Sequence, residues 1–252
     1  MQLNFKDHFS SVSESYASFR PTYPPALFYW LATLPARRAL AWDCACGNGQ
    51  ATAELSKHFT RVVGTDASAA QIQSATREMG NIEWRVAPAE VCGLADAAVD
   101  LVTVAQALHW FDLPKFYRES KRVLNQGGII AVWCYGINKV QDDQVNAVVQ
   151  DFYSNVVGPY WPAERTIVEA GYQTLDFPFA ELPVPSFSME TRWDLHQLLG
   201  YFRTWSATTR YIAAKAVDPV VELAANLAPA WGPPTSEKLI TWPLSIRVGR
   251  IA

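Results

Sequence analysis

Between residues 39 and 135 the sequence alternates short apolar segments with segments of helical periodicity, and no other feature constrains the fold as strongly. Helical crossovers between apolar strands are typical of a parallel sheet, because parallel neighbours cannot be joined by a tight hairpin. The pattern therefore predicts a doubly wound α/β domain with its ligand crevice at the carboxyl ends of the strands. The strands are expected at 39–45, 61–65, 82–86, 99–105 and 128–135.

The helices expected between these strands carry start and stop signals. Ser68 with Gln71 three positions later is a capping box, and Gly80 ends the helix that follows. Asp112 is placed to cap a further helix. The apolar run at 128–135 is the pattern expected of a strand buried on both faces of a parallel sheet.

After the fifth strand the alternation ends. The segment 141–157 can form a helix, and 191–206 is predicted to be an amphipathic helix with its leucines on one side. A final strand is expected at 242–251, where the chain returns to the sheet. We therefore predict a single domain in which residues 138–235 form a helical cap inserted before the last strand.

The composition excludes several classes of protein. Apolar residues make up 50% of the chain and charged residues 18%, which is far from the composition of a disordered protein. The 21 Lys and Arg residues against 24 Asp and Glu give a net charge of -3, and no segment gathers the basic residues that nucleic-acid binding needs. No apolar run approaches the length of a membrane span, and the first residues contain no apolar secretion signal. We expect a cytoplasmic protein that binds neither nucleic acid nor membranes, and no metal site, since the four cysteines lack ligand spacing.

The segment 42–50, WDCACGNGQ, carries the sharpest chemical signal. Asp43 closes the first strand, and small residues follow it at alternate positions, where the backbone can approach a ligand closely as a helix begins. Asp66 closes the second strand, where a carboxylate can accept hydrogen bonds from a ribose diol. Together the two acids predict a cofactor that contains adenosine.

The positions of the glycines distinguish two cofactors. A dinucleotide fingerprint requires a third glycine where this chain has Gln50, which disfavours NAD. The segment instead resembles the first motif of the class I S-adenosylmethionine-dependent methyltransferases (methyltransferase type 11 domain), with Ala45 in place of that motif's first glycine. Two alternatives stay open: an NAD-dependent oxidoreductase, and a catalytically silent S-adenosylmethionine-binding regulatory protein, which the departures at Ala45 and Pro88 suggest.

The resemblance continues in order along the chain. Asp66 matches the family's ribose-binding acid, the segment 86–90 lies where the family contacts adenine, and 100–111 and 122–133 resemble its later motifs. This resemblance implies a Rossmann-like, seven-stranded, mainly parallel sheet with helices on both faces, and S-adenosylmethionine as the cofactor. It divides the chain into a cofactor-covering segment 1–36, a cofactor-binding core 37–137, a substrate cap 138–235 and a final strand 236–252.

Fourteen residues are implied to bind the cofactor, and three of them have an alternative role. Gln106 either faces the cofactor near its sulfonium or only braces the backbone. Asp43 either binds the cofactor's amino group or caps the glycine-rich turn, and Arg20 either pairs with the methionine carboxylate or is an ordinary surface arginine. The set comprises Tyr16, Arg20, Asp43, Ala45, Cys46, Gly47, Asn48, Gly49, Asp66, Ala67, Ala89, Glu90, Gln106 and Ala107.

Within the family, three features resemble the branch related to trans-aconitate methyltransferase: the segment 16–24, the Ala-Leu-His-Trp-Phe run at 107–111 and the late helix expected to contain Trp193. That branch implies O-methylation of a carboxylate on a small acid, by a monomer or homodimer. His109 is the candidate catalytic residue, and His109 and Trp110 are candidate substrate contacts; a structural histidine is the alternative. A carboxylate is ionised at pH 7 and needs no general base, which agrees with the lack of a clear base motif.

Overall fold

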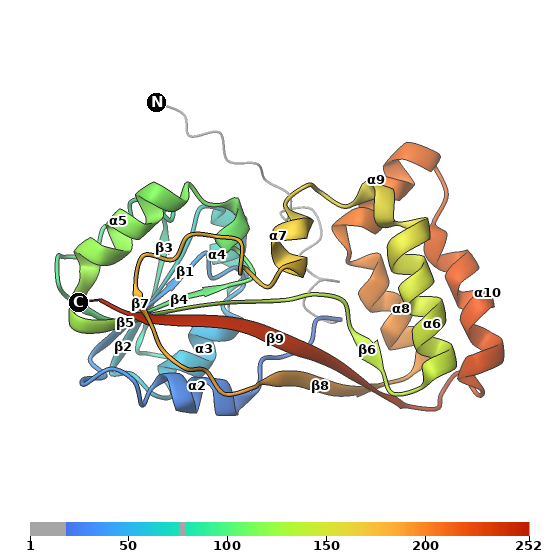
Figure 1. Cartoon of the computed structure of the whole chain (residues 1–252), viewed down its shortest axis with the longest axis horizontal. Helices are drawn as coiled ribbons and strands as arrows, with labels where there is room; N and C mark the ends of the chain where they lie inside the picture. Colours follow the sequence, from blue (N-terminus) through green and yellow to red (C-terminus); the bar gives the residue numbers. More distant parts are fainter. Residues whose placement is uncertain (1–18, 76–78, 252) are drawn as a thin grey trace.

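Figure 1 shows the computed structural model of the chain, which describes residues 19–75 and 79–251. The described strands are β1 (Leu40–Cys44), β2 (Arg61–Asp66), β3 (Ile82–Val86), β4 (Val99–Ala105), β5 (Leu124–Tyr135), β6 (Lys139–Val140), β7 (Ala180–Glu181), β8 (Ser188–Trp193) and β9 (Lys238–Arg250). Over the described residues they form one nine-stranded sheet in the order β3-β2-β1-β4-β5-β9-β6, with β7 and β8 also paired to β9.

Strands β1 to β5 run parallel and carry the cofactor motifs. The order of the strands reverses between β1 and β4, and in such sheets the ligand crevice opens at the carboxyl ends of the strands on either side of this point. The strands predicted at 82–86 and 99–105 are confirmed as β3 and β4.

Helices cover both faces of this parallel part. On one face α2 and α3 pack against Ala41, Val62 and Ala131, and on the other α5 and α7 pack against Trp42 and Val132. The chain forms α2 (Pro25–Leu31), α3 (Gln50–Ser56), α4 (Ala69–Ser74), the short 3-10 turn η1 (Leu108–Trp110), α5 (Leu113–Val123) and α7 (Arg165–Glu169). Neighbouring strand residues serve opposite faces, as the pleat requires. The Rossmann-like arrangement is therefore confirmed.

The expectation of seven strands is wrong for the described chain. Strand β9 is long enough to pair with β5 and β7 at its carboxyl-terminal end and with β6 and β8 at its amino-terminal end, always antiparallel. The short strands β6 to β8 lie in the region expected to be a helical cap. The sheet is mainly parallel only from β1 to β5.

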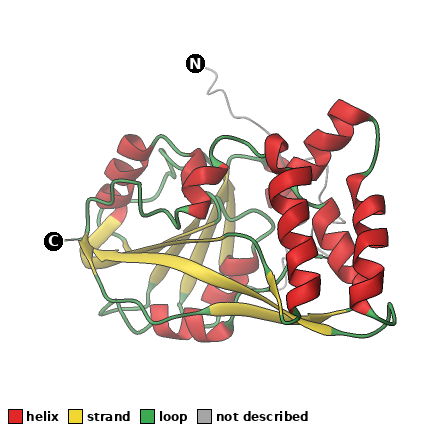
Figure 2. Ribbon diagram, turned by 45° about the vertical axis from the view of Figure 1, so that its right-hand side comes forward, coloured by secondary structure: helices red, strands yellow, loops and turns green. Residues whose placement is uncertain are grey.

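The C-terminal helices stand side by side at one end of the sheet (Figures 1 and 2). They are α6 (Asp143–Asp151), its π-helical continuation η2 (Phe152–Val156), the 3-10 turn η3 (Gly158–Tyr160), α8 (Leu195–Arg203), α9 (Ser206–Lys215) and α10 (Pro219–Trp231). These helices enclose a core of aromatic side chains, to which β8 and β9 contribute Trp193 and Trp242.

Several predicted boundaries are wrong, and the final strand begins at Lys238, four residues before the predicted start at 242. The helix expected at 191–206 begins only at Leu195, because Asp194 and Gln197 form a capping box there, and the residues before it alternate as strand β8. The helix after Ser68 ends at Ser74, before Gly80, because Ala75 is extended. Strand β5 starts at Leu124, four residues before the predicted start at 128.

Candidate functional site

The turn after β1 and the end of β2 meet at the carboxylate of Asp66. Its Oδ2 accepts a hydrogen bond from the backbone N–H of Gly47 at 2.9 Å, and its Oδ1 accepts one from Ser68 at 2.8 Å. Ser68 in turn accepts from the N–H of Gln71, so the predicted N-cap of α4 is confirmed, although the Ser68 N–H is taken by Asp66. Asp66 thus joins the glycine turn to the start of α4.

The two glycines of the turn are needed for different reasons. Gly47 has φ +56, and a Cβ added there would meet one described atom within 4 Å, the Gln71 Oε1 at 3.8 Å. Gly49 has φ +89, and its Cβ would lie 2.3 Å from the Trp84 ring. Gly47 therefore leaves a bare stretch of backbone beside Asp66, as close approach of a ligand requires, whereas Gly49 makes room for a tryptophan.

Asp43 is buried, and the threonines Thr52 and Thr103 occupy its carboxylate. Thr52 of α3 donates to Oδ2 at 2.6 Å and Thr103 of β4 donates to Oδ1 at 2.7 Å. Burial raises the pKa of Asp43 to about 6, against the opposing effect of the two hydroxyls. These contacts join β1 to α3 and β4, and the two roles expected for Asp43, cofactor binding and capping of the glycine-rich turn, stay predictions.

Gln106 and Arg20 converge on Tyr135 at the carboxyl end of β5. Gln106 directly follows β4, has φ +57, and donates from Nε2 to the Tyr135 carbonyl at 3.0 Å. Arg20 donates from Nη1 to the Tyr135 hydroxyl at 3.2 Å and from Nη2 to the Thr204 carbonyl in the cap at 3.3 Å. Sequence reasoning missed Tyr135, because nothing in its own segment marks it.

Gln50, the residue that breaks the dinucleotide pattern, holds the N-terminal segment. Its Nε2 donates to the Pro21 carbonyl at 3.1 Å, and its Oε1 accepts from the Tyr23 N–H at 3.4 Å. One amide therefore fixes the backbone of this segment at the start of α3. Tyr16 lies outside the described residues.

The remaining predicted cofactor residues line the same edge of the sheet or lie beside it. Cys46 donates its N–H to Thr65 on β2, which keeps the turn against that strand. Glu90 accepts a hydrogen bond from the Asp112 N–H at 3.1 Å, so its carboxylate contributes to the start of α5. The other five predicted residues differ in exposure and backbone conformation. Ala45 has a positive φ, Asn48 and Ala67 are half-buried, and Ala89 and Ala107 are buried.

His109 and Trp110 follow at η1, just past Gln106. The Nδ1 of His109 lies 2.9 Å from the hydroxyl of Tyr172, and its ring contacts that of Trp110 at 4.6 Å between centroids. Burial, followed by the positive charge of Arg165, lowers the pKa of His109 to about 4. His109 is therefore neutral at pH 7.

Arg165 begins α7 and lies against aromatic side chains of the cap. Its guanidinium is 4.5 Å from the Trp161 ring and 5.3 Å from the Tyr153 ring, and its Nε donates to the Tyr153 hydroxyl at 2.7 Å. Only 17% of the side chain is exposed, and its ion pair with Glu169 is long, at 3.8 Å. A largely buried positive charge thus lies near His109.

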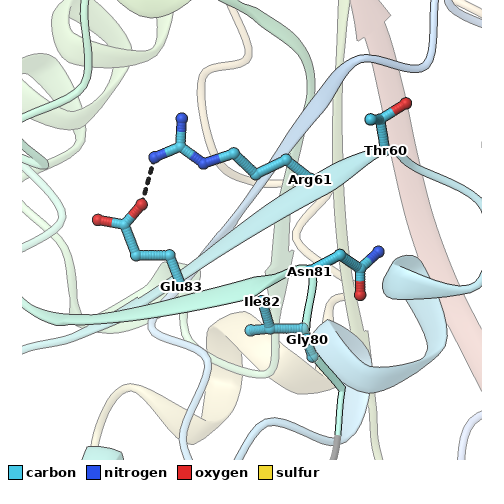
Figure 3. Close-up of a pocket in the computed structure, with 6 residues that line it drawn as sticks. All are labelled: Thr60, Arg61, Gly80, Asn81, Ile82 and Glu83. Atoms are coloured by element: carbon cyan, nitrogen blue, oxygen red, sulfur yellow. Dashed lines mark hydrogen bonds and ion pairs between the residues drawn. The ribbon is translucent and has the colours of Figure 1, made fainter.

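A cavity of about 330 Å³ lies at the opposite end of the strands, where β2 and β3 begin (Figure 3). Arg61 and Glu83 form an ion pair across it, and the glycine turn does not line it. Because Asp66 and Gln106 lie at the other ends of their strands, this cavity is not part of the candidate site.

Comparisons with known proteins agree with this geometry. The family model for a methyltransferase domain matches residues 42–132. A Dictyostelium discoideum protein named as a methyltransferase is 36% identical over 230 residues, which cover 90% of this chain and 87% of the relative. The chain belongs to the methyltransferase family.

Two further similarities extend this result. A solved structure from Anaeromyxobacter dehalogenans, described as a type II methyltransferase, has a TM-score of 0.87 and 45% identity, and covers 92% of this chain and 98% of its own. A Saccharomyces cerevisiae protein named as an S-adenosylmethionine-dependent methyltransferase is 30% identical over 132 residues, or 49% of this chain and 45% of the relative. The chain is an S-adenosylmethionine-dependent methyltransferase, which decides between the two cofactors considered above.

Within the described residues, no helix combines the length and the apolar character that crossing a bilayer requires.

Proposed function

We propose that this methyltransferase acts on a small molecule and methylates a carboxylate oxygen, as in the trans-aconitate branch that the sequence resembles. The observation that carries this proposal is the position of Arg165. Its largely buried guanidinium lies close enough to His109 to lower that residue's pKa. A desolvated cation favours an anionic acceptor, because its charge is poorly screened by water there.

The neutral state of His109 supports the same acceptor class. An alcohol or phenol acceptor would have to lose a proton, and a base with a pKa of about 4 is poorly matched to that task near pH 7. A carboxylate is already ionised at that pH. The chemistry then depends on holding the acceptor in line and keeping water out.

Residues 138–235 are proposed as the substrate cap, with residues 37–137 as the cofactor-binding core. A cavity of about 320 Å³ supports this division, because it lies where the chain leaves β5 for β6 and is lined from both parts. Its lining residues are Gly136, Ile137, Lys139, Tyr153, Glu169 and Pro243. Tyr153 connects this cavity to Arg165, and exposed Lys139 adds a second cation at its wall.

The residues at the carboxyl ends of β1, β2 and β4 fit the cofactor. Gly47 offers bare backbone beside Asp66, whose carboxylate retains further acceptor capacity for a ribose hydroxyl. We propose that Gly47, Asp66 and Gln106 hold S-adenosylmethionine, with Arg20 and Ala89 beside them. When bound, this cofactor supplies a methyl group on a positively charged sulfur.

A screen of acceptors with methyl-labelled S-adenosylmethionine tests the proposal. The panel contains small mono-, di- and tricarboxylic acids, including trans-aconitate, together with phenols and amines. We expect label in a carboxylic acid and a methyl ester as the product. Transfer restricted to phenols or amines would overturn the carboxylate assignment, and transfer to no compound on the panel would overturn a small-acid acceptor.

Arg165→Met then tests the residue that carries the proposal. Methionine keeps the contact with the Trp161 ring but removes the charge, so the KM for the acid should rise at least tenfold, since a charged hydrogen bond is worth roughly 1.5–3 kcal/mol. The affinity for S-adenosylhomocysteine should stay unchanged. Arg203→Met is the matched control, because Arg203 pairs with Asp218 on the exposed side of the cap.

A further inference from the structure

Tyr172 adopts a backbone conformation that a tyrosine rarely takes. Its φ is +62, directly after Gly171 at +61, and its side chain is fully buried. The left-handed region costs free energy for a residue with a Cβ, so surrounding contacts must hold it there. The Tyr172 N–H donates to Ile167 at 3.1 Å, and the Tyr172 carbonyl accepts from Arg247 of β9 at 3.0 Å.

This strained position aims the phenol at the candidate site. The hydroxyl of Tyr172 lies 2.9 Å from His109 Nδ1, across 63 positions of sequence. The two rings are 5.9 Å apart between centroids. A hydrogen bond to one ring nitrogen decides which tautomer the imidazole adopts.

The direction of this hydrogen bond follows from the other contacts of the phenol. Burial raises the pKa of Tyr172 well above its usual value, so the phenol keeps its proton. The backbone N–H groups of Leu108 and His109 oppose this rise, so they act on the phenol oxygen as donors and leave its proton free for another partner. The single O–H of Tyr172 therefore remains to be donated to Nδ1 of His109.

The second ring nitrogen of His109 then carries the proton. No described residue forms a hydrogen bond with Nε2. This atom is also not fully buried, so it stays accessible to a ligand. Arg165 and Glu164 are the charged groups that act on this ring, and the net effect of burial and charge keeps it neutral. An accessible N–H on a neutral ring can donate a hydrogen bond but cannot accept a proton at the same atom.

We propose that Tyr172 is a positioning residue that fixes His109 as the neutral tautomer with its proton on Nε2, and that this N–H donates to a carboxylate oxygen of the acceptor. The second part of this inference rests on the proposed function; the first does not. His109 then orients the acceptor and moves no proton. The role of His109 is thus narrowed from a candidate catalytic residue to a hydrogen-bond donor.

Nitrogen-15 NMR of the full chain with labelled histidine tests the tautomer without any acceptor. The signals of His109 are identified by their loss in His109→Gln, since the chain has four histidines. We expect an unprotonated Nδ1 and a protonated Nε2 in the wild type at neutral pH. In Tyr172→Phe the tautomers should mix and the pKa of His109 should rise, because the donor that favoured the neutral ring is gone.

Tyr117→Phe is the matched control, since Tyr117 is a buried tyrosine whose hydroxyl donates at 2.8 Å to the backbone of Asp176. It should leave the His109 signals unchanged. A proton on Nδ1 of wild-type His109, or tautomers unaffected by Tyr172→Phe, would overturn the inference.

Kinetics with trans-aconitate as the probe test the donor role separately. We expect kcat/KM in the wild type to be constant between about pH 7 and 9, because His109 and the acceptor carboxylate do not change protonation there and Asp43, with a pKa of about 6, is already ionised. His109→Gln, whose amide supplies an N–H near Nε2, should retain at least a third of kcat/KM, whereas His109→Leu should lose tenfold or more through KM. A rate that rises with one ionisation near neutrality would show a base and overturn the donor role. If trans-aconitate is not methylated, the donor role falls with the carboxylate proposal, while the NMR result still decides the tautomer.

Discussion

The two halves of the molecule differ in how rich their cores are in aromatic side chains. The parallel sheet, β1 to β5, packs aliphatic residues such as Val63, Val104 and Ile130 against its helices. The cap packs aromatic residues against one another, and Tyr201 contacts Trp193, Trp205 and Trp242 at 5.4–5.6 Å between ring centroids. At its edge the sheet half exposes backbone and carboxylates to a ligand, whereas the cap offers aromatic rings and guanidinium groups.

The proposed function would give this difference a chemical meaning, with the cofactor bound by one half and the acceptor by the other. Backbone N–H groups and a carboxylate recognise a ligand common to a whole family, because they depend on the fold rather than on large side chains. Aromatic walls with a few charged groups recognise a particular acceptor, because their shape changes with each substitution. Substitutions in the sheet half should therefore alter cofactor affinity, and substitutions in the cap should leave it unchanged.

The largest expected effect is that of Asp66→Ala on cofactor affinity. The substitution removes the carboxylate that holds Gly47 and that we propose to accept a ribose hydroxyl. Calorimetric titration with S-adenosylhomocysteine should show at least a hundredfold loss, or about 3 kcal/mol. Glu83→Ala is the control, because this exposed carboxylate lies at the other end of the sheet and pairs with Arg61 and Arg85. Undiminished binding by Asp66→Ala would contradict the division.

A second pair of variants separates stability from binding within one turn. Gly49→Ala should lower the free energy of unfolding by about 2 to 3 kcal/mol, through its φ and the collision with Trp84. Gly47→Ala should cost about 1 kcal/mol of stability but weaken S-adenosylhomocysteine binding at least tenfold, since its Cβ would occupy the approach to the backbone. Urea unfolding and calorimetry measure the two effects. Equal losses of stability would show that both glycines serve packing.

The smallest expected effect lies in the cap. Trp242 donates from Nε1 to the Tyr201 hydroxyl at 3.0 Å, so Trp242→Phe should cost about 1 kcal/mol more in unfolding free energy than Trp193→Phe, which removes the same ring volume without this hydrogen bond. The affinity for S-adenosylhomocysteine should not change. Trp193→Phe is the matched control, because Trp193 packs against the Tyr201 ring as Trp242 does, and the two tryptophans also contact each other. A cap variant that weakened cofactor binding would show that the two halves are not independent in recognition.

The sheet half could be predicted from the sequence because the patterns that mark its strands and helix caps are local. Strands β3 and β4 match the predicted ranges to the residue, and Asp112 caps α5 as expected. The position of Asp66 beside the glycine turn also followed, since the carboxyl ends of neighbouring parallel strands meet at one edge.

The cap was predicted less accurately because its contacts join segments that are far apart in the sequence. The alternation of buried and exposed residues in β8 is short, and the leucines that follow it have a clear helical spacing. The predicted helix therefore began too early, within β8. Within the site, the hydroxyls of Thr52 and Thr103 reach Asp43 from other elements, and Tyr172 reaches His109 from a loop. No spacing in the sequence marks such pairs.

Strand β9 follows every other described strand and pairs with partners in both halves. Residues 238–250 hydrogen-bond with segments that begin at 129, 139, 180 and 188, so each pairing closes a long loop of chain. During synthesis from the N-terminus, neither the sheet nor the cap can complete its pairing until this segment has left the ribosome. Both halves should therefore reach their final form in one late step, and a nascent chain stalled before residue 238 should be more easily cut by protease in the cap and the sheet alike.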